Sequence, residues 1–238
     1  MADLDFYFDP ICPFAWMTSK WVRDVAGQRA YDVEWRFISL RMVNADVDYA
    51  VHFPDGYERA HSAGLALLRV AAAVRDQAGP SGVADLYASM GARIFEVGPE
   101  RQAAALAAPR ATAAAALAGA GLDAGLADAV GATGFDQLIG SETERALGLT
   151  GRDVGTPILH FDPPAGVALF GPVISRSPSP EDALALWDHV VGLARFPGFA
   201  ELKRSLREVP QLPALGVASD SVGIEEDWRQ GHRRQSAG

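Results

Sequence analysis

Cysteine is almost absent from this sequence: Cys12 is the single cysteine among 238 residues. A chain with one cysteine cannot form a disulfide within itself, so a small fold held together by disulfides is excluded. We therefore expect the protein in a reducing cytoplasm. Any disulfide that Cys12 forms must join it to a thiol from outside the chain.

Positive charge and long apolar runs are also scarce. The chain has 21 Lys and Arg against 30 Asp and Glu, a formal net charge of −9. Nucleic acid is therefore not expected as a main partner, because phosphate binding needs a basic surface. No apolar run approaches the ~20 residues of a membrane helix. The first residues, MADLDFYF, have no basic region, so we expect no secretory signal.

Signatures of metals and bound cofactors are missing as well. The histidines form no His-x-x-x-His pair and have no second cysteine beside them, which argues against a zinc site; they are His52, His61, His160, His189 and His232. No glycine-rich loop of dinucleotide or P-loop type follows a strand. Ser141 and Ser175 have no nucleophile-elbow frame. We expect no metal and no tightly bound cofactor.

Strand patterns lie near both ends of the chain, and helical patterns lie between them. Leu4–Phe8 predicts a strand, the residues from Pro13 to Gly27 predict a helix, and Val33–Leu40 predicts a second strand. Residues 41–56 have the composition of a loop. From Tyr57 to Leu149 the chain is rich in alanine, the best helix former, and we expect four or five helices there.

Strand patterns return at 157–161 and 167–170, and the turn DPPAG between them predicts a hairpin. Ser179 then opens a helix, with proline and two acids in its first turn. The order β-α-β, helical block, β-β-α is that of a thioredoxin fold, so we predict an α/β protein. Residues 1–48 and 150–205 would form the thioredoxin-like domain, 49–149 an inserted all-helical subdomain, and 206–238 a C-terminal tail.

Cys12 is expected at the start of the first helix, directly before Pro13. Unpaired backbone N–H groups and the positive end of the helix dipole favour thiolate there, and such sites can lower a cysteine pKa from ~8.5 to between ~3.5 and ~7.5. Thiolate is the nucleophile in thiol–disulfide exchange. The alternative is that Cys12 is a small buried hydrophobic residue without reactivity. The helix start favours an exposed, reactive thiol.

Thr156-Pro157 leads into the later hairpin. Only ~5–6% of such peptide bonds are cis in folded proteins, and Thr-Pro often simply begins a strand. In thioredoxin folds, a cis-proline packs opposite the active cysteine at this point of the chain, and the residue before it offers backbone groups to a substrate. We therefore predict a cis Pro157 that packs against Cys12.

Five blocks occur in an order that resembles a known family: FYFDPICPFAWMTSKWV, SLRMVN, DVGTPILHF, FGPVIS and FAELKR. They resemble the DsbA-like, mycothiol-dependent nitroreductases of actinobacteria over residues 4–205. The resemblance implies a thioredoxin fold with a helical insertion, a cytoplasmic setting and often a homodimer. It also implies mycothiol as the thiol co-substrate for reducing nitroaromatic or other electrophilic small molecules.

Carried over by position, the resemblance makes Cys12 the nucleophile and places Phe14 where an aromatic residue, usually tryptophan, stands. Asn44 and Tyr57 match residues near the substrate pocket; Asn44 could instead cap a loop, and Tyr57 could be an aromatic residue at a helix entry. Ala15 departs from the Cys-Pro-Trp-Cys version of the family. Without a second thiol in the chain, an outside thiol must release a mixed disulfide on Cys12.

We expect Phe14, Trp16 and the insertion to form an apolar pocket for a flat substrate. Two alternatives remain open on the sequence. One is a relative of kappa-type glutathione transferases or isomerases, which activates the thiol of a bound molecule. The other is a binding protein that keeps only the thioredoxin fold. Alkylation of Cys12 should abolish the favoured chemistry and largely spare the first alternative. A Cys12 pKa near that of a free thiol would favour the second alternative.

Overall fold

A four-stranded sheet forms the centre of the computed structural model, which describes residues 2–203, 206–217 and 225–227. The strands are β1 (Leu4–Phe8), β2 (Val33–Phe37), β3 (Ile158–Phe161) and β4 (Ala168–Phe170), in the order β2-β1-β3-β4. β1 runs parallel to β2 and antiparallel to β3, and β3 pairs antiparallel with β4. This topology confirms the predicted thioredoxin-like α/β fold.

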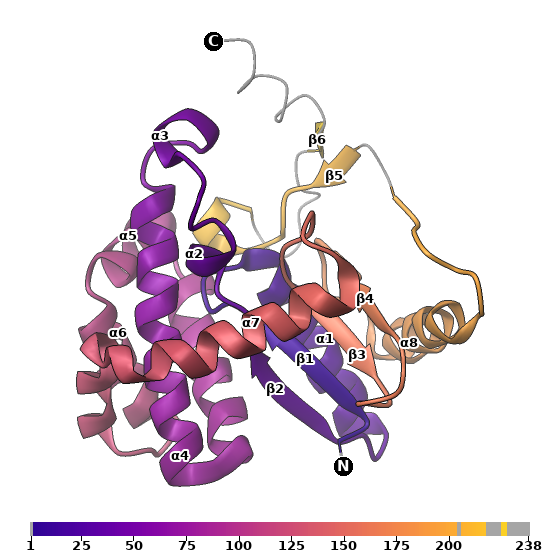
Figure 1. Ribbon diagram of the computed structural model, residues 1–238, viewed down its shortest axis with the longest axis horizontal. Coiled ribbons are helices and arrows are strands. Elements are labelled where there is room, and N and C mark those ends of the chain that lie inside the picture. Colours follow the sequence, from indigo (N-terminus) through magenta and orange to yellow (C-terminus); the bar gives the residue numbers. More distant parts are fainter. Residues whose placement is uncertain (1, 204–205, 218–224, 228–238) are drawn as a thin grey trace.

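Helices cover both faces of this sheet (Figure 1). Helices α1 (Pro13–Gln28) and α8 (Pro180–Arg195) pack on one face, and α7 (Asp136–Thr150) crosses the other. Alternate residues of β1 point to opposite faces. Leu4, Phe6 and Phe8 accordingly belong to the large core with α1, whereas Tyr7 packs with Ile158 in the smaller core under α7.

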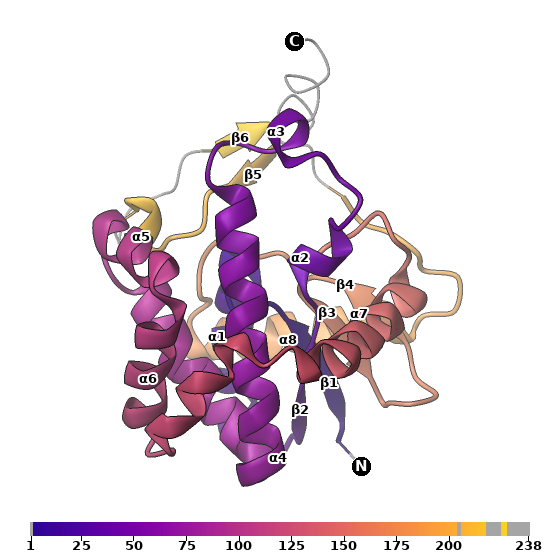
Figure 2. The ribbon, with the colours of Figure 1, turned by 60° about the vertical axis from the view of Figure 1, so that its left-hand side comes forward.

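The helical segment lies beside the sheet (Figure 2). Its members are α4 (Tyr57–Phe95), α5 (Pro99–Ala107), α6 (Pro109–Gly119), the 3-10 helices η1 (Ala124–Gly131) and η2 (Thr133–Phe135), and then α7. Gly79 breaks α4 with a φ of 73°, directly before Pro80. Residues 41–56 were expected to be a loop, but they include most of α2 (Leu40–Val43) and all of α3 (Tyr49–His52). Because α7 itself covers the sheet, the subdomain boundary at residue 149 remains a proposal.

Part of the predicted tail packs against the body of the protein. The described elements there are β5 (Leu206–Glu208), η3 (Pro213–Leu215) and β6 (Glu225–Asp227), whereas 218–224 and 228–238 lie outside the described residues. η3 contacts α4 and α5, and Leu212 is fully buried. The backbone N–H of Gln211 donates to the carbonyl of Ser175 at 2.7 Å. The segment 206–217 therefore spans from the loop after β4 to the helical segment.

Two helix starts follow from their sequences. Ser179 caps α8, where its hydroxyl accepts from the N–H of Asp182, and Pro180 is the first helical residue, as predicted. Cys12 occupies the same position for α1, followed by Pro13. Within the described part of the chain, every helix is too short or too polar to cross a membrane.

Candidate active site

Cys12 lies at the carboxyl end of β1, where the chain turns into α1. The turn is closed by the N–H of Cys12, which donates to the carbonyl of Asp9 at 3.1 Å. Cys12 has extended backbone angles (φ −84°, ψ 114°), and its carbonyl accepts the first helical bond from Trp16 at 3.0 Å. Pro13 is suited to the first helical position because its missing N–H has no intrahelical partner there. The sulfur is thus held at the N-terminus of α1.

Two backbone groups contact the sulfur. Cys12 Sγ donates to the carbonyl of Thr156 at 3.4 Å and accepts from the N–H of Ala15 at 3.4 Å. The Thr156 hydroxyl donates to the carbonyl of Tyr7 at 2.9 Å, which fixes this loop to β1. The Thr156–Pro157 peptide is cis, and the carbonyl of Pro157 accepts from Gly171 at 2.8 Å. The structure therefore brings Cys12, Thr156 and Pro157 together across 144 residues of sequence.

Burial reverses the expected ionisation of the thiol. Cys12 is only 7% exposed, and this burial raises the pKa of Cys12 to about 12. The N–H groups of Ala15 and Phe14 lower the pKa, and the charge of Asp9 raises it. The prediction of an exposed thiol with a lowered pKa is therefore wrong for this structure, because desolvation outweighs the helix N-terminus.

The residues after Cys12 are packed rather than open. Ala15 is fully buried, and Phe14 and Trp16 are 8% and 5% exposed. The Trp16 indole lies against the backbone of Gly91, where an added Cβ would approach its ring atoms to 2.1 Å. Trp16 Nε1 also donates to Glu96 Oε1 at 2.9 Å. Trp16 thus joins α1 to α4, and its place in an apolar substrate pocket remains a prediction.

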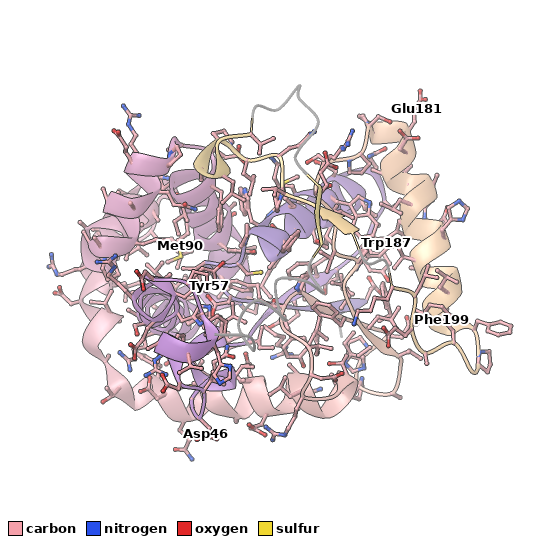
Figure 3. All side chains as sticks on the ribbon, turned by 90° about the horizontal axis from the view of Figure 1, so that it is seen from above. Asp46, Tyr57, Met90, Glu181, Trp187 and Phe199 are labelled. Carbon is pink, nitrogen blue, oxygen red and sulfur yellow. The ribbon has the colours of Figure 1, made fainter. Side chains whose placement is uncertain are left out.

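Asn44 and Tyr57 have local contacts. Asn44 ends α2, and its side-chain amide donates to the carbonyl of Leu40 at 2.8 Å. This is the loop-capping role that the sequence left open. Tyr57 is the first residue of α4; it is 46% exposed, stacks on Phe53 and contacts His61 edge-on. Figure 3 shows Tyr57 on the side of the helical segment, away from Trp187 of α8. The role of both residues in a substrate pocket remains a proposal.

Asp9 is a buried acid beside the thiol that the sequence analysis did not single out. Its side chain is fully buried, three positions before Cys12. One carboxylate oxygen accepts from the N–H of Ile11 at 3.1 Å, and the other accepts from the N–H of Leu40 at 2.8 Å. In the sequence, Asp9 and Pro10 have the composition of a turn after the strand Leu4–Phe8, which gives no sign that Asp9 is buried. An acid within a few residues of the single cysteine was the available signal.

Two surface grooves are lined by residues other than Cys12. One, of about 380 Å³, lies beside Arg23 and Trp35, and the other lies at 98–101. In the described residues, no group of three or more His, Cys, Asp or Glu side chains could hold a metal ion.

Fold and site together define a thioredoxin-fold protein whose single cysteine faces a cis-proline loop. Comparison with known proteins gives the family: the model described as "Mycothiol-dependent nitroreductase Rv2466c" matches residues 11–204. The chain belongs to this Rv2466c-like family, and we class it as an enzyme of redox chemistry on that ground.

Similar proteins include a curated relative and a solved structure. An uncharacterised protein of Mycobacterium tuberculosis, Rv2286c, is 36% identical over 216 residues, which cover 90% of this chain and 84% of that protein. A 2-hydroxychromene-2-carboxylate isomerase structure matches with a TM-score of 0.40 and 17% identity, over 79% of this chain and 94% of the isomerase. A TM-score this low supports no functional conclusion.

Proposed function

We propose that the protein is a thiol-dependent oxidoreductase in which Cys12 alternates between a free and a mixed-disulfide form, with mycothiol as the outside thiol. The observation that carries the proposal is the position of the single cysteine: its sulfur lies at the N-terminus of α1 and contacts the carbonyl of Thr156. The family match supports mycothiol as the thiol and a nitroaromatic or other electrophilic small molecule as the substrate.

The reaction balances in two steps. In the first, Cys12 and one mycothiol give up two electrons and two protons to the substrate, and an S–S bond forms between them. In the second, the thiolate of another mycothiol attacks that bond, mycothiol disulfide leaves, and Cys12 takes up a proton. Ala15 stands where a second cysteine could resolve the bond internally, so the second mycothiol is required.

Access to the sulfur must precede both steps. Burial is the main cause of the raised pKa of Cys12, whereas the N–H groups of Ala15 and Phe14 favour the thiolate. Entry of a polar thiol and its water reduces the desolvation and leaves these two donors in place. Thiolate therefore forms in the opened, occupied site. A cytoplasm whose thiol pool is kept reduced is the setting that this chemistry requires.

Substitution of Cys12 tests the proposal. Cys12→Ser should retain the fold and lose mycothiol-dependent reduction of a nitroaromatic test compound, because serine cannot form the mixed disulfide. The matched control is Ser141→Ala, on the exposed side of α7, which should retain turnover. Turnover near the wild-type level in a folded Cys12→Ser protein would reject the mechanism.

The raised pKa of Cys12 favours a second candidate. In this alternative the protein activates the thiol of a bound small molecule, as kappa-type glutathione transferases and isomerases do, and Cys12 is part of the packing. Complete alkylation of Cys12 distinguishes the two: it should abolish the proposed reaction and largely spare the alternative. A non-catalytic binding protein would show neither activity.

A further inference from the structure

Asp9 is a buried acid that joins three elements around the thiol. It follows β1, it accepts from the N–H of Ile11 in the turn that leads to Cys12, and it accepts from the N–H of Leu40 at the start of α2. From α4, the backbone of Gly64 lies directly against it: a Cβ on Gly64 would be 2.5 Å from Asp9 Oδ1. A residue that only closed a turn would not need contacts with α2 and α4.

We propose that Asp9 is a positioning residue for Cys12: its carboxyl group holds the reactive turn, and its charge state sets how readily Cys12 becomes a thiolate. The inference rests on the proposed function in that Cys12 is taken as the nucleophile. In this proposal Asp9 does not touch the substrate and acts only through Cys12.

The electrostatics follow from burial. Burial raises the pKa of Asp9 to about 7, although the two N–H donors lower it. The carboxylate in turn raises the pKa of Cys12. A carboxylate with a thiol, and a neutral carboxyl with a thiolate, each carry one negative charge, whereas the doubly ionised pair would carry two in a buried site. Such groups titrate as a coupled pair, so thiolate is favoured when Asp9 holds the proton.

Other titratable side chains pack near the pair of Asp9 and Cys12. From α4, Tyr87 lies near both groups, and burial raises its pKa far above the usual range. From α3, Tyr49 bonds to His61 Nδ1 at 2.8 Å, and burial lowers the pKa of His61 to about 4. Tyr87, Tyr49 and His61 therefore keep one charge state between about pH 5 and 9.

The charged residues of α2 and α4 near this region are Arg41 and Glu58, which pair with each other at 3.5 Å. Of the groups around Cys12 with a shifted pKa, Asp9 is the one whose pKa, raised to about 7, falls between about pH 5 and 9.

The pH dependence of Cys12 modification tests the inference. The probe is methyl methanethiosulfonate, which transfers a methylthio group to the Cys12 thiolate with methanesulfinate as the leaving group. The wild-type rate should rise with pH, flatten around the titration of Asp9, and rise again. In Asp9→Asn the flattening should disappear, and the rate should be on the order of tenfold higher at about pH 9 but little changed at about pH 5.5.

Two further variants separate charge from packing. Gly64→Ala disturbs the contact with the carboxylate but keeps its charge, so the flattening should remain. Leu40→Pro removes the N–H that bonds Asp9, at a first helical position where proline is tolerated, and should move the flattening to higher pH. This variant also serves if Asp9→Asn does not fold.

Three results would overturn the inference: a wild-type profile without flattening, flattening that survives in Asp9→Asn, or a rate increased by one factor at every pH. The last would mean only that the site had loosened. Failure of the proposed function is a separate result, in which Cys12 of the wild type reacts with the thiosulfonate but forms no mixed disulfide with mycothiol.

Discussion

Replacing Gly91 by alanine tests how α4 holds the helix that carries Cys12. Alanine in place of an open helical glycine stabilises a protein by roughly 0.5–1 kcal/mol. At Gly91 the added Cβ would lie 2.1 Å from Cε3 and Cζ3 of Trp16, far inside contact distance. The indole is buried and bonded to Glu96, so α1 and α4 must move apart. Overpacking of this kind costs about 1–3 kcal/mol.

The matched control is Gly148→Ala on the exposed side of α7, where an added Cβ meets nothing within 4 Å. We expect Gly91→Ala to have a free energy of unfolding about 2 kcal/mol below that of Gly148→Ala, or a Tm about 4–8 °C lower for a chain of this size. Urea and thermal unfolding, followed by circular dichroism and tryptophan fluorescence, measure the difference. Equal stability of the two variants would refute the packing of Trp16 on Gly91.

Three further predictions concern the thiol and a buried histidine. At about pH 8, iodoacetamide should modify Cys12 in the native protein about a thousandfold more slowly than in the unfolded chain, because its pKa is raised from 9.0 to about 12; rates within tenfold of each other would contradict the burial. Ala15→Cys should form a disulfide with Cys12 in one chain, seen as a two-hydrogen mass loss, and should hold less mycothiol adduct than wild type; a stable adduct without that mass loss would reject the geometry. Burial lowers the pKa of His61 from 6.5 to about 4, so protonation opposes folding and up to roughly 3 kcal/mol of stability is lost as pH falls from 6.5 toward 4. His61→Gln should lose less stability over that range than wild type and the exposed control His189→Gln, and equal losses would exclude His61 as the cause.

Local patterns were sufficient for the framework of the fold. Alternation and turn residues identify the strands on both sides of the helical block, and Ser179 and Pro180 identify the start of α8. The short helices α2 and α3 were not predicted, because four-residue helices give too little periodicity for a pattern to show. The burial of Leu212 was missed for a related reason: the apolar residues of the stretch VPQLPALGV (209–217) follow neither a strand nor a helix period, and the burial of Leu212 depends on packing against α4 and α5.

The state of the site depends on contacts between distant parts of the chain. The sequence predicts the helix start at Cys12, but the burial of Cys12 involves the Thr156 loop, which lies 144 residues away along the chain. Trp16 meets Glu96 across 80 residues, and Asp9 meets Leu40 across 31. No local pattern reports desolvation, and desolvation decides the sign of the Cys12 pKa shift. The sequence could therefore identify the sulfur and the Pro157 loop beside it, but not the desolvation of the thiol.

Intact-mass measurement of the mycothiol adduct is the most direct test of the central claim. The reduced protein is incubated with mycothiol disulfide and weighed, and excess mycothiol is then added. Because Cys12 is the only cysteine, one adduct locates the reaction without further mapping. The account predicts one mycothiol per chain, released by the second addition, and none on Cys12→Ser. A folded wild-type protein that takes up no mycothiol, or whose adduct mycothiol does not release, would contradict it.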